Sequence, residues 1–340
     1  MSLPVLPKAL ELDRPQATFR EQPEDFYVEE VLGFEPDGDG EHLWLFLEKT
    51  NLNTQDVVKI ISEHTGIKSR DIGFSGMKDR RAVTRQWFSV KAGDSFQEIV
   101  HPGLNLLEQK RNSRKLKRGV HRQNRFRIRL RNMAVSNCNE ALQVVVDKIR
   151  SSGVPNYFGL QRFGKEGANL ENALAFFTGS LKRCTQYQRG IYLSAARAYL
   201  FNQVLAKRVK EGNWNGLVEG DVMALNGSSS VFTSETGDEQ LAGRLDSGDI
   251  HPTGPLWGAG KLQSQAAVMS LENSVASEFY GLAEGLAQNG LKQERRPLRV
   301  SPADLAVSRE GEETVMVEFA LSRGSYATSV LRELVEASGL

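Results

Sequence analysis

Cysteine and histidine are scarce in this chain of 340 residues, which contains two cysteines, Cys138 and Cys184, and five histidines. Two cysteines allow neither a disulfide framework nor a four-cysteine zinc site. The histidines are scattered singly, without the HExxH spacing of zinc hydrolases. We therefore expect a protein that binds no metal.

Long apolar runs are also missing, and no stretch approaches the roughly 18 residues that a membrane helix needs. The first residues, MSLPVLPKALELDRP, have no apolar core of the signal-peptide kind, and their early prolines favour an extended arm. The sequence therefore predicts a cytoplasmic protein that does not enter a membrane.

The net charge of +1 gives no indication of a nucleic-acid partner, but it hides a segregation of charge. Residues 21–48 hold ten acids and no Lys or Arg, whereas residues 110–131 hold eleven Lys or Arg and no acid. Charge sorted in this way creates a strong local field that a net value does not report.

The basic segment ends in a strand signature. Phe126, Ile128 and Leu130 alternate with arginines, so one face is apolar and the other basic. A dense basic strip of this kind can neutralise several backbone phosphates. We expect a structured nucleic-acid ligand, with RNA and DNA both open at this step. The residues of the strip that we expect to bind it are Arg114, Lys115, Lys117 and Arg118.

The stretch GFSGMKDRRAVTRQWF, residues 73–88, offers two candidate reactive groups. Ser75 is the weaker one, because a nucleophile elbow reads G-x-S-x-G and here Met77 stands where the second glycine belongs. We interpret Ser75 as a turn residue. A serine hydrolase would be labelled by a fluorophosphonate, and we expect no labelling.

Asp79 is the stronger candidate, since Lys78, Arg80, Arg81 and Arg85 around it favour the ionised carboxylate. An ionised aspartate is a poor general acid and a competent nucleophile or base. A solvent-exposed aspartate that pairs with nearby bases would have the same neighbours. The spacing alone leaves both interpretations open.

Five motifs, in this order along the chain, resemble the tRNA pseudouridine synthase D (TruD) family. They are PEDFYVEEVLGFEPDGDGEHLWL, GMKDRRAVTRQ, NRFRIRLR, VPNYFGLQRFG and FALSRGSYATSVLREL. The second resembles the family's signature around its catalytic aspartate. Long motifs in a shared order make chance agreement improbable, and together they extend over almost the whole chain.

The resemblance implies an α/β (α+β) fold, in which a mixed, mainly antiparallel central sheet is flanked by helices. It also implies an α/β domain inserted into the catalytic domain. Changes of sequence texture near residues 154 and 298 fit such an insertion. We therefore expect a discontinuous catalytic domain of residues 1–153 and 299–340, and an inserted domain of residues 154–298.

The activity that the resemblance implies is isomerisation of uridine 13 of tRNA to pseudouridine, without cofactor or metal. Asp79 would be the nucleophile and Arg20 its ion-pair partner, at a position where the family often has lysine. Phe126 would stack on the target uracil, and the other expected substrate contacts are Phe26, Asn124 and Phe319. We expect a monomer. A non-catalytic RNA-binding or folding factor on the same fold is the alternative.

Overall fold

The computed structural model describes residue 3 and residues 6–91, 99–133, 138–228, 230–234 and 239–337. Its helices are α1 (Thr54–Thr65), α2 (Cys138–Ser152), α3 (Ala168–Phe177), α4 (Gln186–Lys210), α5 (Glu239–Asp246), α6 (Ala266–Glu278), α7 (Tyr280–Gln288) and α8 (Ala327–Leu334). Short 3-10 helices are η1 (Pro23–Asp25), η2 (Ser69–Asp71), η3 (Leu160–Phe163) and η4 (Lys165–Gly167).

The strands are β1 (Thr18–Phe19), β2 (Phe26–Val31), β3 (His42–Thr50), β4 (Gly73–Phe74), β5 (Val83–Lys91), β6 (Leu104–Asn112), β7 (Gln123–Arg131), β8 (Val154–Pro155), β9 (Val222–Leu225), β10 (Val231–Thr233), β11 (Ile250–Leu256), β12 (Glu294–Pro297), β13 (Arg299–Val300), β14 (Ala303–Arg309) and β15 (Val315–Ser322).

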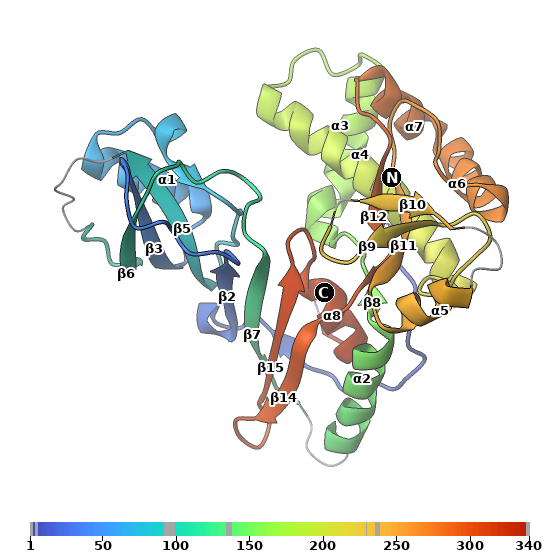
Figure 1. Ribbon diagram of the computed structural model, residues 1–340, viewed down its shortest axis with the longest axis horizontal. Coiled ribbons are helices and arrows are strands. Elements are labelled where there is room, and N and C mark those ends of the chain that lie inside the picture. Colours follow the sequence, from blue (N-terminus) through green and yellow to red (C-terminus); the bar gives the residue numbers. More distant parts are fainter. Residues whose placement is uncertain are drawn as a thin grey trace.

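The largest sheet has nine strands and is mainly antiparallel. Its main path runs β14-β15-β7-β2-β5-β3-β6, and β1 and β4 pair with β7 and β5. Strands β2 and β5 run parallel, and the other pairs of this sheet are antiparallel. The expected mixed, mainly antiparallel sheet is confirmed. With helices α1, α2 and α8 it forms what we call the sheet lobe, at the left and lower centre of Figure 1.

Helices cover the sheet through their apolar residues. Val57 and Ile61 of α1 pack in one buried cluster with Leu45 and Phe88 of β3 and β5. Helix α1 begins after Asn53, whose side chain accepts from two backbone N–H groups, and ends at Gly66 in the left-handed conformation. Helices α2 and α8 pack against β7 and β15 in a second cluster.

A second sheet, ordered β10-β9-β11-β12, lies beside helices α3 to α7 at the right of Figure 1. We call this part the helical lobe. Its core gathers around α4, where Ala196 and Tyr199 pack with Leu170 of α3 and Leu286 of α7. The segment between β8 and β13 leaves and rejoins the sheet lobe at one place, because these strands pair with Val154 opposite Val300 and Pro155 opposite Arg299.

Two helix boundaries deserve comparison with the sequence. Apolar periodicity over residues 263–286 predicts a helix interrupted at Gly281, but the break lies at Phe279, between α6 and α7, and Gly281 is helical. Tertiary packing decides the position, since the Phe279 ring makes an edge-to-face contact with Tyr199 at 5.1 Å. The sequence also predicts that α2 is capped near Asn137, a residue that lies outside the described ranges.

The segregated charges partly neutralise one another, because β2 pairs with β7. Asp25, fully buried just before β2, accepts three hydrogen bonds from Arg131 and lies 3.6 Å from Arg129. Glu35 pairs with Lys110 at 2.9 Å. The basic face of β7 is therefore only partly available to an external anion.

Candidate active site

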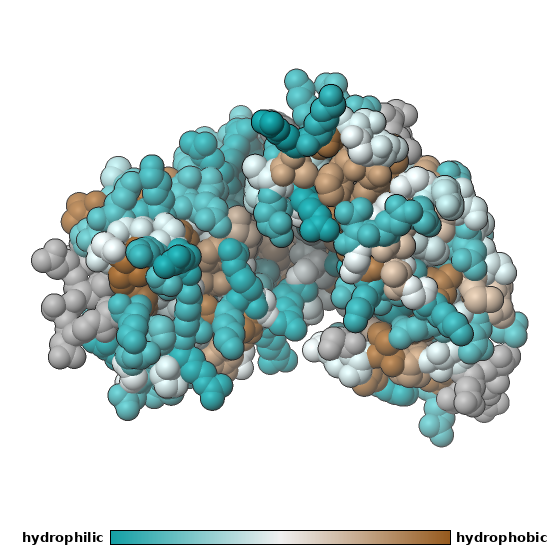
Figure 2. All heavy atoms as spheres, turned by 90° about the horizontal axis from the view of Figure 1, so that it is seen from above, coloured by the Kyte–Doolittle hydropathy of each residue, from teal (hydrophilic) through white to brown (hydrophobic). Residues whose placement is uncertain are grey.

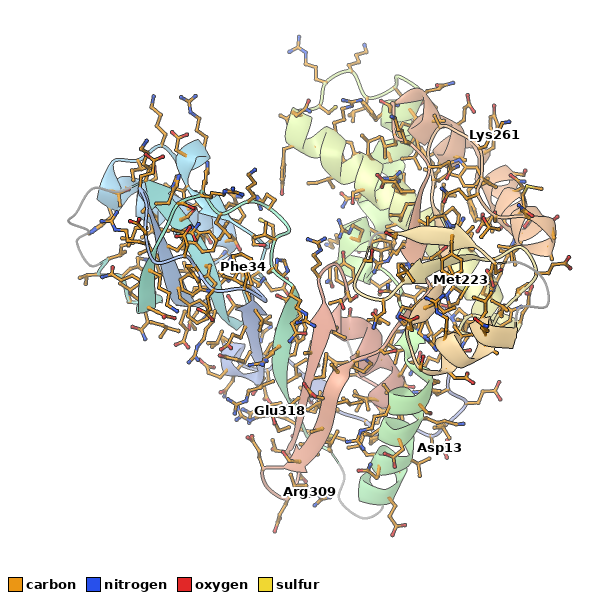
Figure 3. All side chains as sticks on the ribbon, in the orientation of Figure 1. Asp13, Phe34, Met223, Lys261, Arg309 and Glu318 are labelled. Carbon is orange, nitrogen blue, oxygen red and sulfur yellow. The ribbon has the colours of Figure 1, made fainter. Side chains whose placement is uncertain are left out.

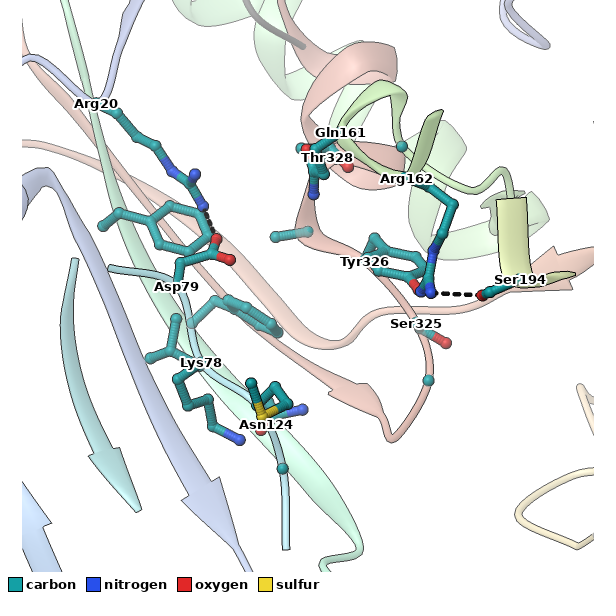
Figure 4. Close-up of a pocket in the computed structure, with 18 of the residues that line it drawn as sticks. Arg20, Lys78, Asp79, Asn124, Gln161, Arg162, Ser194, Ser325, Tyr326 and Thr328 are labelled. Atoms are coloured by element: carbon teal, nitrogen blue, oxygen red, sulfur yellow. Dashed lines mark hydrogen bonds and ion pairs between the residues drawn. The ribbon is translucent and has the colours of Figure 1, made fainter. Parts of the chain in front are cut away.

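A cleft of about 670 Å³ opens between the two lobes. Figure 2 shows the molecule hollowed between them, and Figure 4 shows side chains on both walls. The sheet-lobe wall includes Arg20, Phe26, Lys78, Asp79, Asn124 and Phe126. The facing wall includes Gln161, Arg162, Asn169, Tyr187 and Ser194 of the helical lobe, with Ser325, Tyr326 and Thr328 at the start of α8.

Asp79 lies in the loop between β4 and β5, and its side chain is 48 % exposed. Its carboxylate forms an ion pair with the Arg20 guanidinium, which reaches it from the segment after β1. The guanidinium carbon also lies 3.7 Å from the centroid of the Phe26 ring. The structure thus brings an accessible carboxylate, a cation and an aromatic ring together at one end of the cleft.

A buried polar network holds the Asp79 loop from below. Glu30 of β2, whose side chain is fully buried, accepts from Lys78 Nζ at 2.9 Å and from the Gly76 backbone N–H at 3.2 Å. The ammonium group of Lys49, on β3, donates a hydrogen bond to the Asp79 backbone carbonyl at 2.8 Å. Burial lowers the pKa of Lys49 to about 8. The backbone of Asp79 is therefore fixed, while its carboxylate, paired with Arg20, stays exposed to the cleft.

Gly76 is required by close packing in this loop rather than by an unusual dihedral angle. A Cβ atom at this position would lie 2.6 Å from Lys78 Nζ and 3.1 Å from Glu30 Oε2. A side chain at this position would therefore require the Lys78 ammonium to shift away from its present contact with Glu30. The glycine and the buried pair form one unit.

Ser75 is buried in the same loop, and its Oγ lies 2.6 Å from His121 Nδ1. Glu30 Oε2 lies 3.7 Å from that same nitrogen. In a catalytic triad the serine and the carboxylate contact opposite ring nitrogens. Burial lowers the pKa of His121, which favours the neutral ring. The geometry therefore supports a structural role for Ser75, as its sequence context predicts.

Three phenylalanines form a row beside Asp79. The Phe126 ring lies between Phe26, at a centroid distance of 6.1 Å, and Phe319, on which it stacks at 5.2 Å. Phe26 and Phe126 line the cleft. Phe319 is 3 % exposed and packs behind Phe126, outside the set of lining residues. Of the three expected contacts, two reach the cleft directly.

Asn124 lies two residues before Phe126 on β7 and also lines the cleft. Its Oδ1 atom is buried and has no hydrogen-bond partner among the residues that the structure describes. Since an unsatisfied buried acceptor is costly, this oxygen is well placed to accept a hydrogen bond from a bound molecule.

The expected RNA-binding residues lie on the segment between β6 and β7. Arg114, Lys117 and Arg118 are exposed, and Lys115 donates to the backbone of Arg70 at 2.9 Å. Lys115, Lys117 and Arg118 line a cavity of about 540 Å³. Gln55 also lines this cavity, and its Nε2 atom lies 3.9 Å from the Sδ atom of Met77, which lines the cleft. The strip therefore adjoins the cleft.

The facing wall was not foreseen from the sequence. Arg162, on η3, donates to Ser194 Oγ at 2.8 Å and to the Tyr326 hydroxyl. Both Arg162 and Tyr326 belong to motifs that the sequence singles out, VPNYFGLQRFG and FALSRGSYATSVLREL. Those motifs indicate that both residues matter, but Arg162 and Tyr326 are 164 residues apart, so the sequence does not show that they are in contact.

Within the described ranges, no group of three or more His, Cys, Asp or Glu side chains is arranged to hold a metal ion. None of the helices in those ranges combines the length and apolarity of a bilayer span.

Comparisons with known proteins agree with one another. The profile of the family described as tRNA pseudouridine synthase D (TruD) matches residues 9–172 and 167–334. The chain is 45 % identical to the tRNA pseudouridine synthase D of Chromohalobacter salexigens, over 94 % of this chain and 92 % of that protein. It is 43 % identical to the Methylococcus capsulatus protein of the same name, over 93 % of this chain and 90 % of that protein.

Similarity extends to a solved structure. The crystal structure of the TruD protein of Methanosarcina mazei superposes with a TM-score of 0.76 at 22 % identity, covering 98 % of this chain and 96 % of that one. Such a likeness shows a shared fold, while the family profile and the curated relatives carry the assignment. The chain belongs to the tRNA pseudouridine synthase D (TruD) family.

Proposed function

We propose that this protein is a tRNA pseudouridine synthase that isomerises uridine 13 of tRNA, with Asp79 as the nucleophile. The observation that carries the proposal is the position of Asp79. Its carboxylate is accessible in a cleft, paired with Arg20, and adjacent to the Phe26 and Phe126 rings. The names of the relatives support tRNA as the substrate class.

In the proposed reaction the Asp79 carboxylate either attacks C1′ of the uridine or removes a proton from C2′. The bond between C1′ and N1 breaks, and its electron pair moves to uracil. The freed base turns, and C5 bonds to C1′ as the bond to Asp79 breaks or the C2′ proton returns. C5 then loses its proton and N1 gains one, so substrate and product are isomers.

The target base must leave its stack before Asp79 can reach the sugar, at a cost of a few kcal/mol. Stacking on an aromatic ring returns about 1 to 3 kcal/mol per base. We assign this contact to Phe126, with Phe26 beside it and Phe319 supporting its rear face. Asn124 would hydrogen-bond the substrate through its free Oδ1.

The domain division belongs to the same proposal, with residues 1–153 and 299–340 as the catalytic domain and residues 154–298 as the inserted domain. The β8–β13 ladder supports it, because the inserted residues leave and rejoin the catalytic part there. The N-terminal arm also contacts the helical lobe, through Leu6 and Ala9. Arg114, Lys115, Lys117 and Arg118 would contact the tRNA backbone. A cytoplasmic location and a monomeric state remain predictions.

The test is the Asp79→Ala variant, assayed for pseudouridine at position 13 of transcribed tRNA by chemical mapping. We expect pseudouridine formation to fall by roughly 10³-fold or more, with tRNA affinity retained. Ser75→Ala removes the other candidate nucleophile and should still form pseudouridine, with a loss far smaller than that of Asp79→Ala. Wild-type turnover by Asp79→Ala would refute the assignment. If the wild-type protein itself binds tRNA without modifying it, the non-catalytic alternative is correct.

A further inference from the structure

Two arginines share the same pair of aromatic rings behind the facing wall of the cleft. The guanidinium carbons of Arg162 and Arg296 lie 5.5 and 4.2 Å from the Phe158 centroid. They lie 5.8 and 5.9 Å from the Tyr326 centroid. Arg162 comes from η3 and Arg296 from β12. The fold thus holds two positive charges side by side.

Neither arginine pairs with a carboxylate among the described residues, and their acceptors are neutral. Arg296 donates to the Gly324 carbonyl at 2.9 Å and to Asn156 Oδ1 at 2.6 Å, while Arg162 donates to two hydroxyl groups. Burial lowers the pKa of Arg296 to about 10, which still leaves it charged at neutral pH. Both arginines are partly buried, and a partly buried charge without a counter-ion favours an external anion.

This excess positive charge is accessible through Arg162. Arg162 lines the cleft, on the wall that faces Asp79 in Figure 4. Two of its five N–H groups are used by Ser194 and Tyr326, which leaves donors for a ligand. Thr328, on the same wall, has a buried Oγ1 without a partner among the described residues.

We propose that Arg162, supported by Arg296 and oriented by Ser194 and Tyr326, binds a backbone phosphate of the RNA beside the flipped target nucleotide. This inference rests on the proposed function and names the part of the substrate that the helical lobe holds. Guanidinium groups suit phosphate oxygens because they donate in a planar fork. Asp79 and Phe126 on one wall would then act on the sugar and base, while the other wall holds the backbone.

Binding measurements in an Asp79→Ala background test this without turnover. Affinity for transcribed tRNA is measured from low to high salt for the parent, Arg162→Gln, Arg162→Lys and Lys261→Gln. Lys261 is the matched control, because it is exposed on the outer side of the helical lobe and does not line the cleft (Figure 3).

We expect Arg162→Gln to weaken binding roughly tenfold at moderate salt. Its slope of log K against log salt should be lower by about 0.7 to 0.9, the value of one phosphate contact. Arg162→Lys should keep most of the slope, and Lys261→Gln should match the parent. A slope for Arg162→Gln equal to that of the parent would overturn the proposal, provided thermal unfolding shows the variant folded. If Arg162→Gln does not fold, the phosphate contact is tested with Arg162→Lys in the following assay.

A phosphate-ethylation interference map identifies the contact. In the parent, ethylation next to the target uridine should impair binding. At one phosphate, Arg162→Gln should lose that interference, and Arg162→Lys should show it more weakly than the parent. An interference pattern identical in parent and variant would exclude a phosphate contact by Arg162. Both assays read binding alone. A wild-type protein that forms no pseudouridine would therefore refute the proposed function without changing either outcome.

Discussion

Arg20 has a left-handed backbone conformation, with φ at 58°, which costs a side-chain-bearing residue about 1 kcal/mol or more. That conformation directs its guanidinium to Asp79 and over the Phe26 ring. A residue held in this way contributes little to folding, since an ion pair with an exposed partner is worth about 0 to 1 kcal/mol. The strain is therefore explained by positioning rather than by stability.

The Arg20→Gly variant separates these two effects. Glycine accepts the left-handed conformation without cost, so we expect the free energy of unfolding to change by less than about 1 kcal/mol. Pseudouridine formation should fall by roughly 10²-fold, since electrostatic support of a reacting group has about this size. Arg20→Lys, which keeps the charge, should lie between. Single-turnover kinetics measure the rate of pseudouridine formation, and urea unfolding measures the stability. A wild-type rate for Arg20→Gly would contradict a positioning role for Arg20.

Some of this site was predictable from local sequence. The bases around Asp79 already favour an anion there, and the alternation on β7 places Asn124 and Phe126 on one face. The anchoring of the loop was not predictable. Glu30 and Lys78 are 48 residues apart, and Lys49 reaches the Asp79 carbonyl from β3. Such contacts depend on strand order and register, which one sequence does not specify.

At the level of elements, the β2–β7 pair carries a buried electrostatic contact at its end. Burial alone would raise the pKa of the Asp25 carboxyl. Hydrogen bonds from Arg131 and the Gln22 N–H, with the charges of Arg131 and Arg129, outweigh burial, so this pKa lies below its ordinary value. The carboxylate thus links η1, β2 and β7. Its loss would leave Arg131 with only the more distant Glu21, at 3.7 Å, while Arg129 would keep Glu310.

We predict that Asp25→Asn lowers the free energy of unfolding at pH 7 by roughly 3 kcal/mol. Because the pKa of Asp25 is lower in the folded state, its contribution exists above the unfolded value and disappears as pH falls through the folded value. The gap between wild type and variant should therefore narrow below about pH 4. Urea unfolding across pH measures this, and a gap independent of pH would contradict it.

The matched control is Glu318→Gln on β15. Glu318 pairs with Arg127 at 3.0 Å, but both side chains are about half exposed, and Figure 3 shows Glu318 on the same sheet. Exposed pairs contribute about 0 to 1 kcal/mol. This variant should therefore unfold nearly as the wild type does, at every pH tested.

Elements with strong local signals were predictable. Helix α1 has its capping residue and its terminal glycine in the sequence, and β7 has strict alternation. The break between α6 and α7 was placed two residues late, because glycine is a weaker determinant there than the packing of Phe279. Gly281 stays helical, and a Cβ there would lie 3.3 Å from Leu174.

At the scale of the whole molecule, the basic strip beside the cleft is predicted to determine much of the affinity for RNA. Charge reversal of Arg114, Lys117 and Arg118 should weaken tRNA binding and flatten its salt dependence by about 0.7 to 0.9 per lost phosphate contact. Equilibrium binding across salt concentrations measures this. Unchanged affinity and slope would assign the strip another role.

The overall architecture followed from the order of the motifs rather than from periodicity, because the resemblance supplied a fold that short strands alone do not define. The facing wall of the cleft did not follow from it. That wall is assembled from η3, α3, α4 and the start of α8, and only the folded chain brings these segments to one surface. Motif order fixes the identity of such segments but not their mutual contacts.

The β8–β13 ladder has a consequence for the genetic history of the chain. Pro155 and Arg299 are direct antiparallel partners, so a two-residue hairpin turn has the right length to join them. A single in-frame deletion of the intervening codons would then leave every strand of the nine-stranded sheet in its original connection. Under the proposed division into a catalytic and an inserted domain, one insertion into such a hairpin would make the same change in reverse.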